Sequence, residues 1–155
     1  MLEQITVKKG TILQKSGELN TKVYKVVSGL LRSYSIDKKG KQHIFMFAPE
    51  GWIMADNVFP ELPCELYIDA IEDSVLEVYS KDLQKENKNT IAFIKRIAVL
   101  QKRVILLLSA SAIERYEHFE ITYPDIIKRV PQKMIASYLG ITPEALSNVK
   151  SKRFK

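Results

Sequence analysis

The sequence predicts an α+β protein made of an N-terminal antiparallel β-roll or jelly roll, a long helix and a C-terminal helix-turn-helix. Three patterns support this class. Residues 1–83 contain short apolar–polar alternations between glycines, residues 84–112 contain a helical apolar repeat without glycine or proline, and residues 132–151 have the spacing of two steeply crossing helices. We therefore expect the 155 residues to form three parts, 1–83, 84–112 and 113–155.

Short strands separated by turns predict the roll. The glycines of this segment stand where turns are expected, at Gly10, Gly17, Gly29, Gly40 and Gly51. Six or more short strands at such spacing are typical of a β-sandwich or roll. A loop that contains two prolines, residues 59–65, is expected to interrupt the sheet.

The apolar repeat of residues 84–112 predicts a dimerisation helix. One row of residues recurs at steps of three and four, namely Ile91, Ile94, Ala98, Gln101, Ile105, Leu108 and Ala112. A second apolar row consists of Phe93, Ile97, Leu100, Val104 and Leu107. A helix that is apolar on two faces is buried on two sides, so we expect the body of the protein on one side and a second copy of the chain on the other. A helix buried inside a monomer is the alternative.

Residues 132–151 match a helix-turn-helix at both its apolar and its turn positions. The residues spaced to form a core shared by two helices are Ile135, Leu139, Ile141, Leu146 and Val149. Ala136 is small where the helices would cross, and Gly140 provides the positive φ of the turn. Thr142 can cap the second helix and Pro143 suits its first position. A generic helical hairpin, the alternative, would not explain these small, turn and capping residues together.

The net charge of the chain resides at its C-terminal end. From Lys128 onward there are seven basic residues and one acidic residue, which accounts for the whole charge of +6. Such a distribution indicates a polyanionic partner, so we expect residues 113–155 to bind double-stranded DNA. The predicted base-reading residues are Pro143, Glu144, Ser147, Asn148 and Ser151. The predicted phosphate contacts are Lys133, Thr142, Lys150, Lys152 and Arg153.

Composition disfavours enzymes, metal sites and membrane proteins. The single cysteine, Cys64, excludes an internal disulfide, and its acidic neighbours Glu61 and Glu65 are expected to raise its pKa and leave it inert. The two histidines, His43 and His118, are too far apart in sequence for a cupin-type metal enzyme, and no nucleophile motif or phosphate-binding loop occurs. No apolar run reaches the ~20 residues of a membrane span, and the N-terminus lacks a signal core. We expect a cytoplasmic, non-enzymatic protein without cofactor, metal or membrane partner.

The order of roll, long apolar helix and helix-turn-helix resembles the Crp/Fnr family of bacterial transcription regulators. Residues 111–124, SAIERYEHFEITYP, resemble the hinge and following helix of the family, and residues 129–150 resemble the DNA-reading unit of a short-chain branch. The resemblance implies a homodimer that binds double-stranded DNA, with RNA polymerase and a small-molecule effector as further partners. The helix that precedes the roll in the family and the β-hairpin wing that often follows the motif are not found in this sequence.

The roll departs from the cyclic-nucleotide binders of the family. Their Gly-Glu-Leu stretch corresponds to residues 55–57 here, Ala-Asp-Asn, and their Arg-Ser pair corresponds to Cys64-Glu65. Without the arginine, the guanidinium fork that pairs with phosphate is missing, so we expect no binding of cyclic AMP. If a pocket for another effector exists, the residues expected to line it are Met54, Ala55, Asp56, Asn57, Cys64 and Glu65, with Gln101 closing over it.

Two sites of the second helix also differ from the family pattern. Family members often carry arginine where this chain has Pro143 and Asn148, which predicts a different sequence preference. An alternative function is therefore a ligand-sensing or protein-interaction module that has lost DNA binding.

Overall fold

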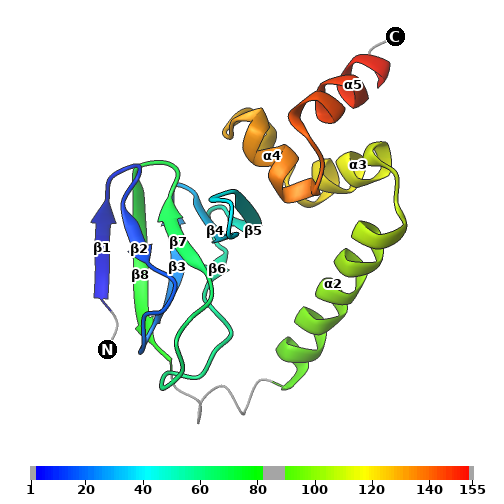
Figure 1. The fold of residues 1–155 in the computed structure, drawn as a ribbon. Helices are drawn as coiled ribbons and strands as arrows, with labels where there is room; N and C mark the ends of the chain where they lie inside the picture. The colour runs from blue at the N-terminus through cyan, green and yellow to red at the C-terminus, as the bar shows by residue number, and fades with distance from the viewer. Residues whose placement is uncertain (1–2, 82–89, 154–155) are drawn as a thin grey trace. The chain divides into compact units, whose positions relative to one another are not determined.

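The computed structural model describes residues 3–81 and 90–153 (Figure 1). The chain divides into two compact units, residues 1–81 and 82–155. Residues 84–89 of the predicted dimerisation helix lie outside the described residues. Within the described part of the chain, no helix is long and apolar enough to span a membrane.

The described residues of the first unit, 3–81, form eight antiparallel strands. They are β1 (Glu3–Val7), β2 (Ile12–Gln14), β3 (Lys22–Ser28), β4 (Leu31–Ile36), β5 (Gln42–Ala48), β6 (Ile53–Met54), β7 (Tyr67–Ala70) and β8 (Ser74–Ser80). They form two four-stranded sheets with the orders β1-β8-β3-β6 and β2-β7-β4-β5. The predicted antiparallel architecture is confirmed, and the segment between β6 and β7 is the expected proline-containing loop.

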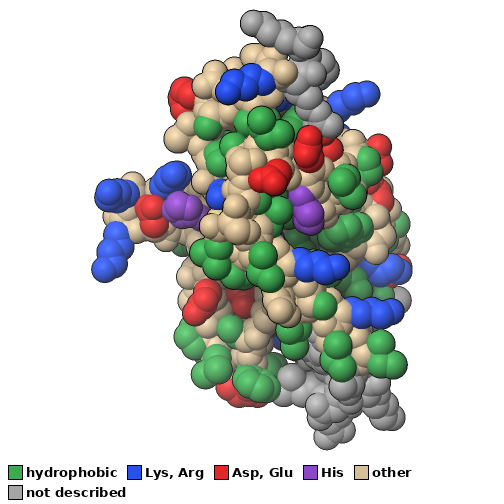
Figure 2. All heavy atoms as spheres, turned by 90° about the vertical axis from the view of Figure 1, so that its right-hand side faces the viewer, with side chains coloured by type: hydrophobic (Ala, Val, Ile, Leu, Met, Phe, Trp, Pro, Cys, Tyr) green, Lys and Arg blue, Asp and Glu red, His purple; other side chains and the backbone are tan. Residues whose placement is uncertain are grey.

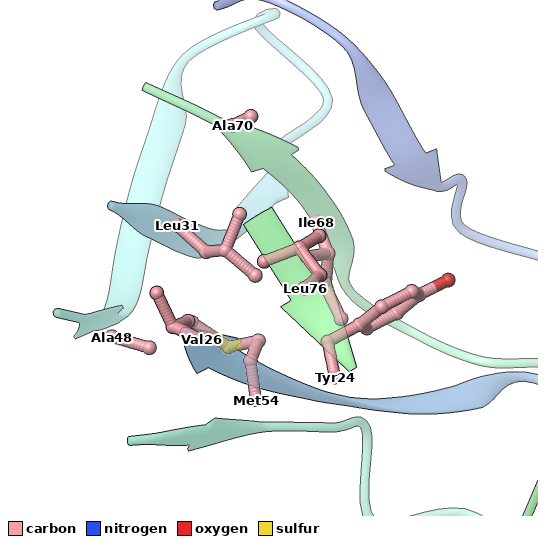
Figure 3. Close-up of a cluster of buried hydrophobic side chains, with 8 residues drawn as sticks. All are labelled: Tyr24, Val26, Leu31, Ala48, Met54, Ile68, Ala70 and Leu76. Atoms are coloured by element: carbon pink, nitrogen blue, oxygen red, sulfur yellow. The ribbon is translucent and has the colours of Figure 1, made fainter. Parts of the chain in front are cut away.

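The core of this unit draws side chains from both sheets. Tyr24, Val26, Met54 and Leu76 come from one sheet, and the other provides Leu31, Ala48, Ile68 and Ala70 (Figure 3). Alternation along each strand places these residues on the inner faces, which removes their apolar surface from water. The sequence pattern of the roll is therefore explained by a core between two sheets.

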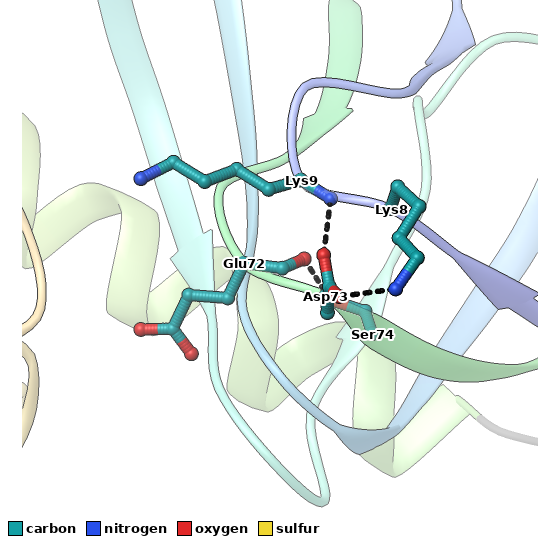
Figure 4. Close-up of polar contacts among 5 residues, drawn as sticks. All are labelled: Lys8, Lys9, Glu72, Asp73 and Ser74. Atoms are coloured by element: carbon teal, nitrogen blue, oxygen red, sulfur yellow. Dashed lines mark hydrogen bonds and ion pairs between the residues drawn. The ribbon is translucent and has the colours of Figure 1, made fainter.

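The turn between β7 and β8 packs so closely against the turn between β3 and β4 that the latter needs a glycine, Gly29. Gly29 has φ +95°, and a Cβ placed on it would lie 2.6 Å from the carbonyl oxygen of Asp73. The Asp73 carboxylate accepts hydrogen bonds from the ammonium of Lys8 and the backbone N–H of Lys9, both at 2.8 Å, and the Ser74 hydroxyl donates to the Glu72 carbonyl (Figure 4). The glycine predicted as a turn residue thus also permits a close approach of two turns.

A buried ion pair joins β4 and β7. Arg32 donates from Nε and Nη2 to the two carboxylate oxygens of Asp69, at 2.8 and 2.9 Å, and its guanidinium lies 4.4 Å from the centre of the Tyr34 ring. Both charged residues are 8% exposed. Burial lowers the pKa of Arg32, but the hydrogen bond and charge of Asp69 outweigh it and raise that pKa above its ordinary value. Arg32 therefore remains charged and depends on its partner.

The second unit is helical. It contains α2 (Thr90–Ser109), α3 (Ala112–Thr122), the 3-10 turn η1 (Ile126–Lys128), α4 (Gln132–Leu139) and α5 (Pro143–Arg153). The break between α2 and α3 carries a capping box, in which the Ser111 hydroxyl accepts from the N–H of Glu114 and the Glu114 carboxylate accepts from the N–H of Ser111. The hydroxyl and amide of Ser111 hold the pKa of Glu114 below its usual value. Helix α3 ends at Thr122, because Pro124 disfavours a helical conformation at the residue that precedes it, Tyr123.

Aromatic side chains fill the centre of the helical unit. The rings of Phe119, Tyr123 and Tyr138 lie 5.3 to 5.5 Å apart in pairs. The tilted and edge-on arrangements are those that aromatic quadrupoles favour. This cluster attaches α4 to α3.

Candidate nucleic-acid interface

Helices α4 and α5 pack through most of the residues that the sequence spacing selects. Of the five predicted core residues, Ile135, Leu139, Leu146 and Val149 are buried with at most 6% exposed, as is Ala136. The fifth, Ile141, lies in the turn between the helices and is only half-buried. The inward direction predicted for Leu146 and Val149 is therefore confirmed. The same packing turns the opposite face of α5 to the solvent.

The connection between α4 and α5 has the predicted turn and cap. Gly140 ends α4 in the left-handed region with φ 66° and ψ 30°. The Thr142 hydroxyl accepts a hydrogen bond of 3.1 Å from the backbone N–H of Ala145, so Thr142 caps α5 and Pro143 occupies its first position. The phosphate contact assigned to Thr142 remains a prediction. The hydroxyl of Thr142 already accepts the hydrogen bond from Ala145.

All five predicted base-reading residues are exposed on α5. Pro143, Ser147 and Ser151 line one surface hollow of about 520 Å³, together with Lys150 and with Gln132 from the first turn of α4. Asn148 and Glu144 are exposed outside this hollow. The sequence prediction thus selected the exposed face of one helix.

Gln132 is a surface residue that the sequence prediction missed. It is exposed at the start of α4 and lines the hollow beside α5. Its amide can donate and accept hydrogen bonds with bases or phosphates. The sequence offered one signal for this role: Gln132 is a polar residue at the first position of the motif. In the structure it lies beside Pro143, the first residue of α5.

The pKa of the acidic residue of this face, Glu144, is lowered by its local hydrogen bonds. The backbone N–H of Glu144 itself and the hydroxyl of Thr142 lower the pKa of the Glu144 carboxyl. A carboxylate at the first turn of a helix is also favoured by the helix dipole. Glu144 therefore presents acceptor oxygens to any partner of α5.

Basic residues are concentrated at this end of the helical unit, and Lys150 lines the hollow beside Ser147 and Ser151. Lys133 and Lys152 are exposed and Lys150 is half-buried, while the side chain of Arg153 lies outside the described residues. Glu144 is the one acidic residue in the sequence from Lys128 onward. The residues from Lys128 onward therefore carry a net positive charge.

Helix α2 exposes large apolar side chains. In its first predicted row, Ile91 is 71%, Ile94 61%, Ile105 54% and Leu108 81% exposed. In the second row, Ile97 and Val104 are 63% and 55% exposed, while nothing is described for the side chain of Phe93. The helix also carries four basic residues and no acidic residue. Figure 2 shows one face of the molecule, on which exposed hydrophobic side chains (green) alternate with basic ones (blue). Such a row on one helix is costly to leave in water.

The predicted pocket residues of the roll have different surroundings. Met54 is fully buried in the hydrophobic core, whereas Asn57 and Glu65 are exposed and Ala55 is intermediate. The buried Asp56 carboxylate accepts hydrogen bonds from the N–H groups of Glu65 and Leu66, at 3.1 and 2.9 Å. The two segments assigned to the pocket are therefore joined by Asp56. Gln101 belongs to α2 in the other unit, and its role in the pocket remains a prediction.

Cys64 is buried, and its thiol donates to the carbonyl oxygen of Lys15 at 3.0 Å. Burial raises the pKa of the Cys64 thiol, and the charges of Asp56 and Glu18 raise it further. The predicted direction is confirmed, but burial and these two carboxylates are the cause instead of the adjacent Glu61 and Glu65. Among the described residues, no cluster of histidine, cysteine and carboxylate groups could hold a metal ion.

The comparisons with known proteins agree on one architecture. No protein-family model matches the chain. It is 24% identical to the nitrogen fixation regulation protein FixK of Rhizobium meliloti (strain 1021), over 95% of this chain and 73% of that protein.

Solved structures show the likeness over nearly the whole chain. The structure of FixK2 from Bradyrhizobium japonicum superposes with a TM-score of 0.81 at 20% identity, covering 98% of this chain and 84% of that one. A CRP/FNR-family transcriptional regulator from Thermus thermophilus gives a TM-score of 0.77 at 15% identity, covering 97% and 84%. FixK and the Thermus protein are named as regulators, not as enzymes. The resemblance predicted from the sequence is thus confirmed: the chain has the fold of the Crp/Fnr family of transcription regulators.

Proposed function

We propose that this protein is a homodimeric transcription regulator in which α4 and α5 form a helix-turn-helix that binds double-stranded DNA. The observation that carries the proposal is the division of α5 into two faces. Leu146 and Val149 are buried against the unit, while Glu144, Ser147, Asn148 and Ser151 are exposed and Lys150 lies beside the two serines. A helix with this division can enter the major groove with its core intact.

The exposed residues have the chemistry of base reading. Asn148 can bond adenine through two hydrogen bonds, and the carboxylate of Glu144, whose pKa is lowered, can accept from the amino group of cytosine. Ser147 and Ser151 can pair with several bases, while Lys133, Lys150, Lys152 and Arg153 contribute phosphate contacts. In this proposal, the polar residues of α5 contact the bases and the basic residues contact the phosphates.

The apolar row of α2 supports the proposed dimer. Burying an isoleucine or leucine side chain is worth roughly 1.5–3 kcal/mol. The exposed Ile91, Ile94, Ile105 and Leu108 would bury such surface against the same row of a second copy. A two-fold dimer implies a palindromic DNA site with half-sites ~34 Å apart, one helical turn.

By analogy with the family, we also propose RNA polymerase and a small-molecule effector as partners and the cytoplasm as the location.

The roll is proposed not to bind cyclic AMP, because Cys64-Glu65 stands in place of the Arg-Ser pair and the Asp56 carboxylate already accepts two backbone N–H groups. Calorimetric titration with cyclic AMP is expected to give no heat of binding. A micromolar dissociation constant would contradict this expectation.

The lysines of α5 should determine how strongly DNA binding depends on salt. Changing Lys150 and Lys152 to glutamine should weaken binding to every duplex and lower the slope of log K against log salt by about two, since each phosphate contact contributes about 0.9. Binding isotherms over a salt series measure this slope.

The matched control changes the same charge in the roll. Lys38 and Lys39 are exposed in the turn between β4 and β5, and the double change to glutamine there should leave the slope within about 0.5 of the original. If the control lowers the slope as much as the α5 variant does, binding is diffuse and the helix-turn-helix is not its site. If no duplex is bound at low salt, the alternative applies, an interaction module that has lost DNA binding.

A further inference from the structure

The C-terminal end of α4 is held by side chains from two other helices. The last four carbonyl groups of a helix lack partners within it. In α4, the carbonyls of Ala136 and Ser137 accept from the backbone N–H of Gly140. The remaining two, of Tyr138 and Leu139, accept from arginines outside α4. These two contacts attach the turn between α4 and α5 to the rest of the unit.

Arg115 of α3 makes three of the hydrogen bonds that join these helix ends. Its Nη1 donates to the Leu139 carbonyl at 3.1 Å, its Nη2 to the Leu107 carbonyl at 2.8 Å, and its Nε to the Ala110 carbonyl at 3.0 Å. Leu107 lies in the last turn of α2 and Ala110 directly follows it. One guanidinium therefore joins the C-terminal ends of α2 and α4, where a positive charge is favoured by both helix dipoles.

Two further contacts confirm that these helix ends are adjacent. The guanidinium of Arg103, from α2, lies 4.1 Å from the centre of the Tyr138 ring and donates to the Tyr138 carbonyl at 3.5 Å. A Cβ placed on Gly140 would meet both Arg115 Nη1 and Leu107 Cδ2 at 3.7 Å. The turn of the motif thus packs directly on the end of α2.

We propose that Arg115 is a positioning residue that fixes the direction of α5 relative to α2 and thereby sets the half-site spacing that the dimer accepts. This inference rests on the proposed function. A helix of 11 residues is about 16 Å long, so a rotation of 10° at its base displaces its far end by about 3 Å. That displacement is close to the ~3.4 Å rise of one nucleotide in a strand of DNA. A fixed fork of three donors limits such rotation better than a single ammonium could.

The test separates half-site binding from spacing. A palindromic duplex selected from a random pool is compared with the same duplex carrying one extra base pair, a shift of ~3.4 Å, between its halves, and with a single half-site. The wild-type protein is expected to prefer the original spacing by ~10-fold or more, because a rigid connection confines avidity to one geometry. Arg115→Met should reduce this preference to less than ~3-fold and keep the single half-site affinity within ~3-fold of wild type.

Two further variants define the cause. Arg115→Lys retains the charge without the fork and should lose the spacing preference as Arg115→Met does. Lys102→Met removes one positive charge from an exposed position of α2 and should behave as wild type. Circular dichroism and half-site binding show whether each variant is folded.

Three results would overturn the proposal: a spacing preference that persists in Arg115→Met, full recovery of that preference in Arg115→Lys, or loss of half-site binding together with full-site binding, which would make Arg115 a general structural residue. If the wild-type protein binds none of the duplexes, the proposed function itself fails and the inference fails with it.

Discussion

Changing both Ile94 and Ile105 to lysine is expected to convert the protein from a dimer to a monomer. The two residues lie in one row of α2 and are 61% and 54% exposed in the single chain. In a dimer, the variant would place four charges in an apolar contact, where an unpaired ion is strongly disfavoured. Sedimentation velocity should show the mass of one chain, and affinity for a palindromic duplex should fall by ~100-fold because both half-sites no longer bind together.

The control for this variant uses apolar residues of the roll. Ile12 and Ile53 are 49% and 53% exposed, so changing both to lysine alters charge and apolar surface equally in the first unit. This control should remain dimeric. An unchanged dimer in the α2 variant, or a monomer in both variants, would contradict dimerisation through α2.

Replacing Asp69 by asparagine should destabilise the roll by ~3 kcal/mol or more. The change leaves the Arg32 guanidinium buried without its counter-ion, and breaking a buried pair in this way typically costs ~3–5 kcal/mol. Urea denaturation, monitored by a signal from the β-sheet, measures the free energy of unfolding.

The matched control is Asp73→Asn, which removes an exposed ion pair. The side chains of Lys8 and Asp73 are 84% and 58% exposed. Solvent screening limits such a pair to less than ~1 kcal/mol. Equal losses in the two variants would show that burial of the Arg32–Asp69 pair does not determine its contribution.

Local patterns predicted most elements of this fold, but the helix predicted to reach residue 112 ends at Ser109, and Ala112 of its first row begins α3. Leu146 and Val149 could be assigned to the core because helical periodicity relates them directly, and Gly140 could be assigned to a turn because few other residues adopt positive φ. The capping box at Ser111 also has a local signature, serine followed three residues later by glutamate, which locates the break between α2 and α3.

Contacts between distant segments could not be predicted in this way. Arg32 and Asp69 are 37 residues apart, and their pairing depends on the register of β4 against β7. The three acceptors of Arg115 become neighbours only when two helix ends meet. Asp56 was assigned to a ligand pocket by alignment with the family, whereas its carboxylate bonds the backbone of residues 65 and 66.

The proposal that α5 reads DNA is tested most directly by determining which DNA sequences the protein selects. Incubation with a pool of random duplexes, recovery of the bound fraction and sequencing test base reading and dimer symmetry together. A dimer that inserts two copies of α5 should enrich inverted repeats whose centres are ~10–10.5 base pairs, or a multiple, apart. Enrichment should weaken at one position of each half-site in Asn148→Ala, by ~1–3 kcal/mol. Absence of any enriched sequence, or enrichment of a single unrepeated half-site, would contradict a homodimeric regulator that reads DNA through α5.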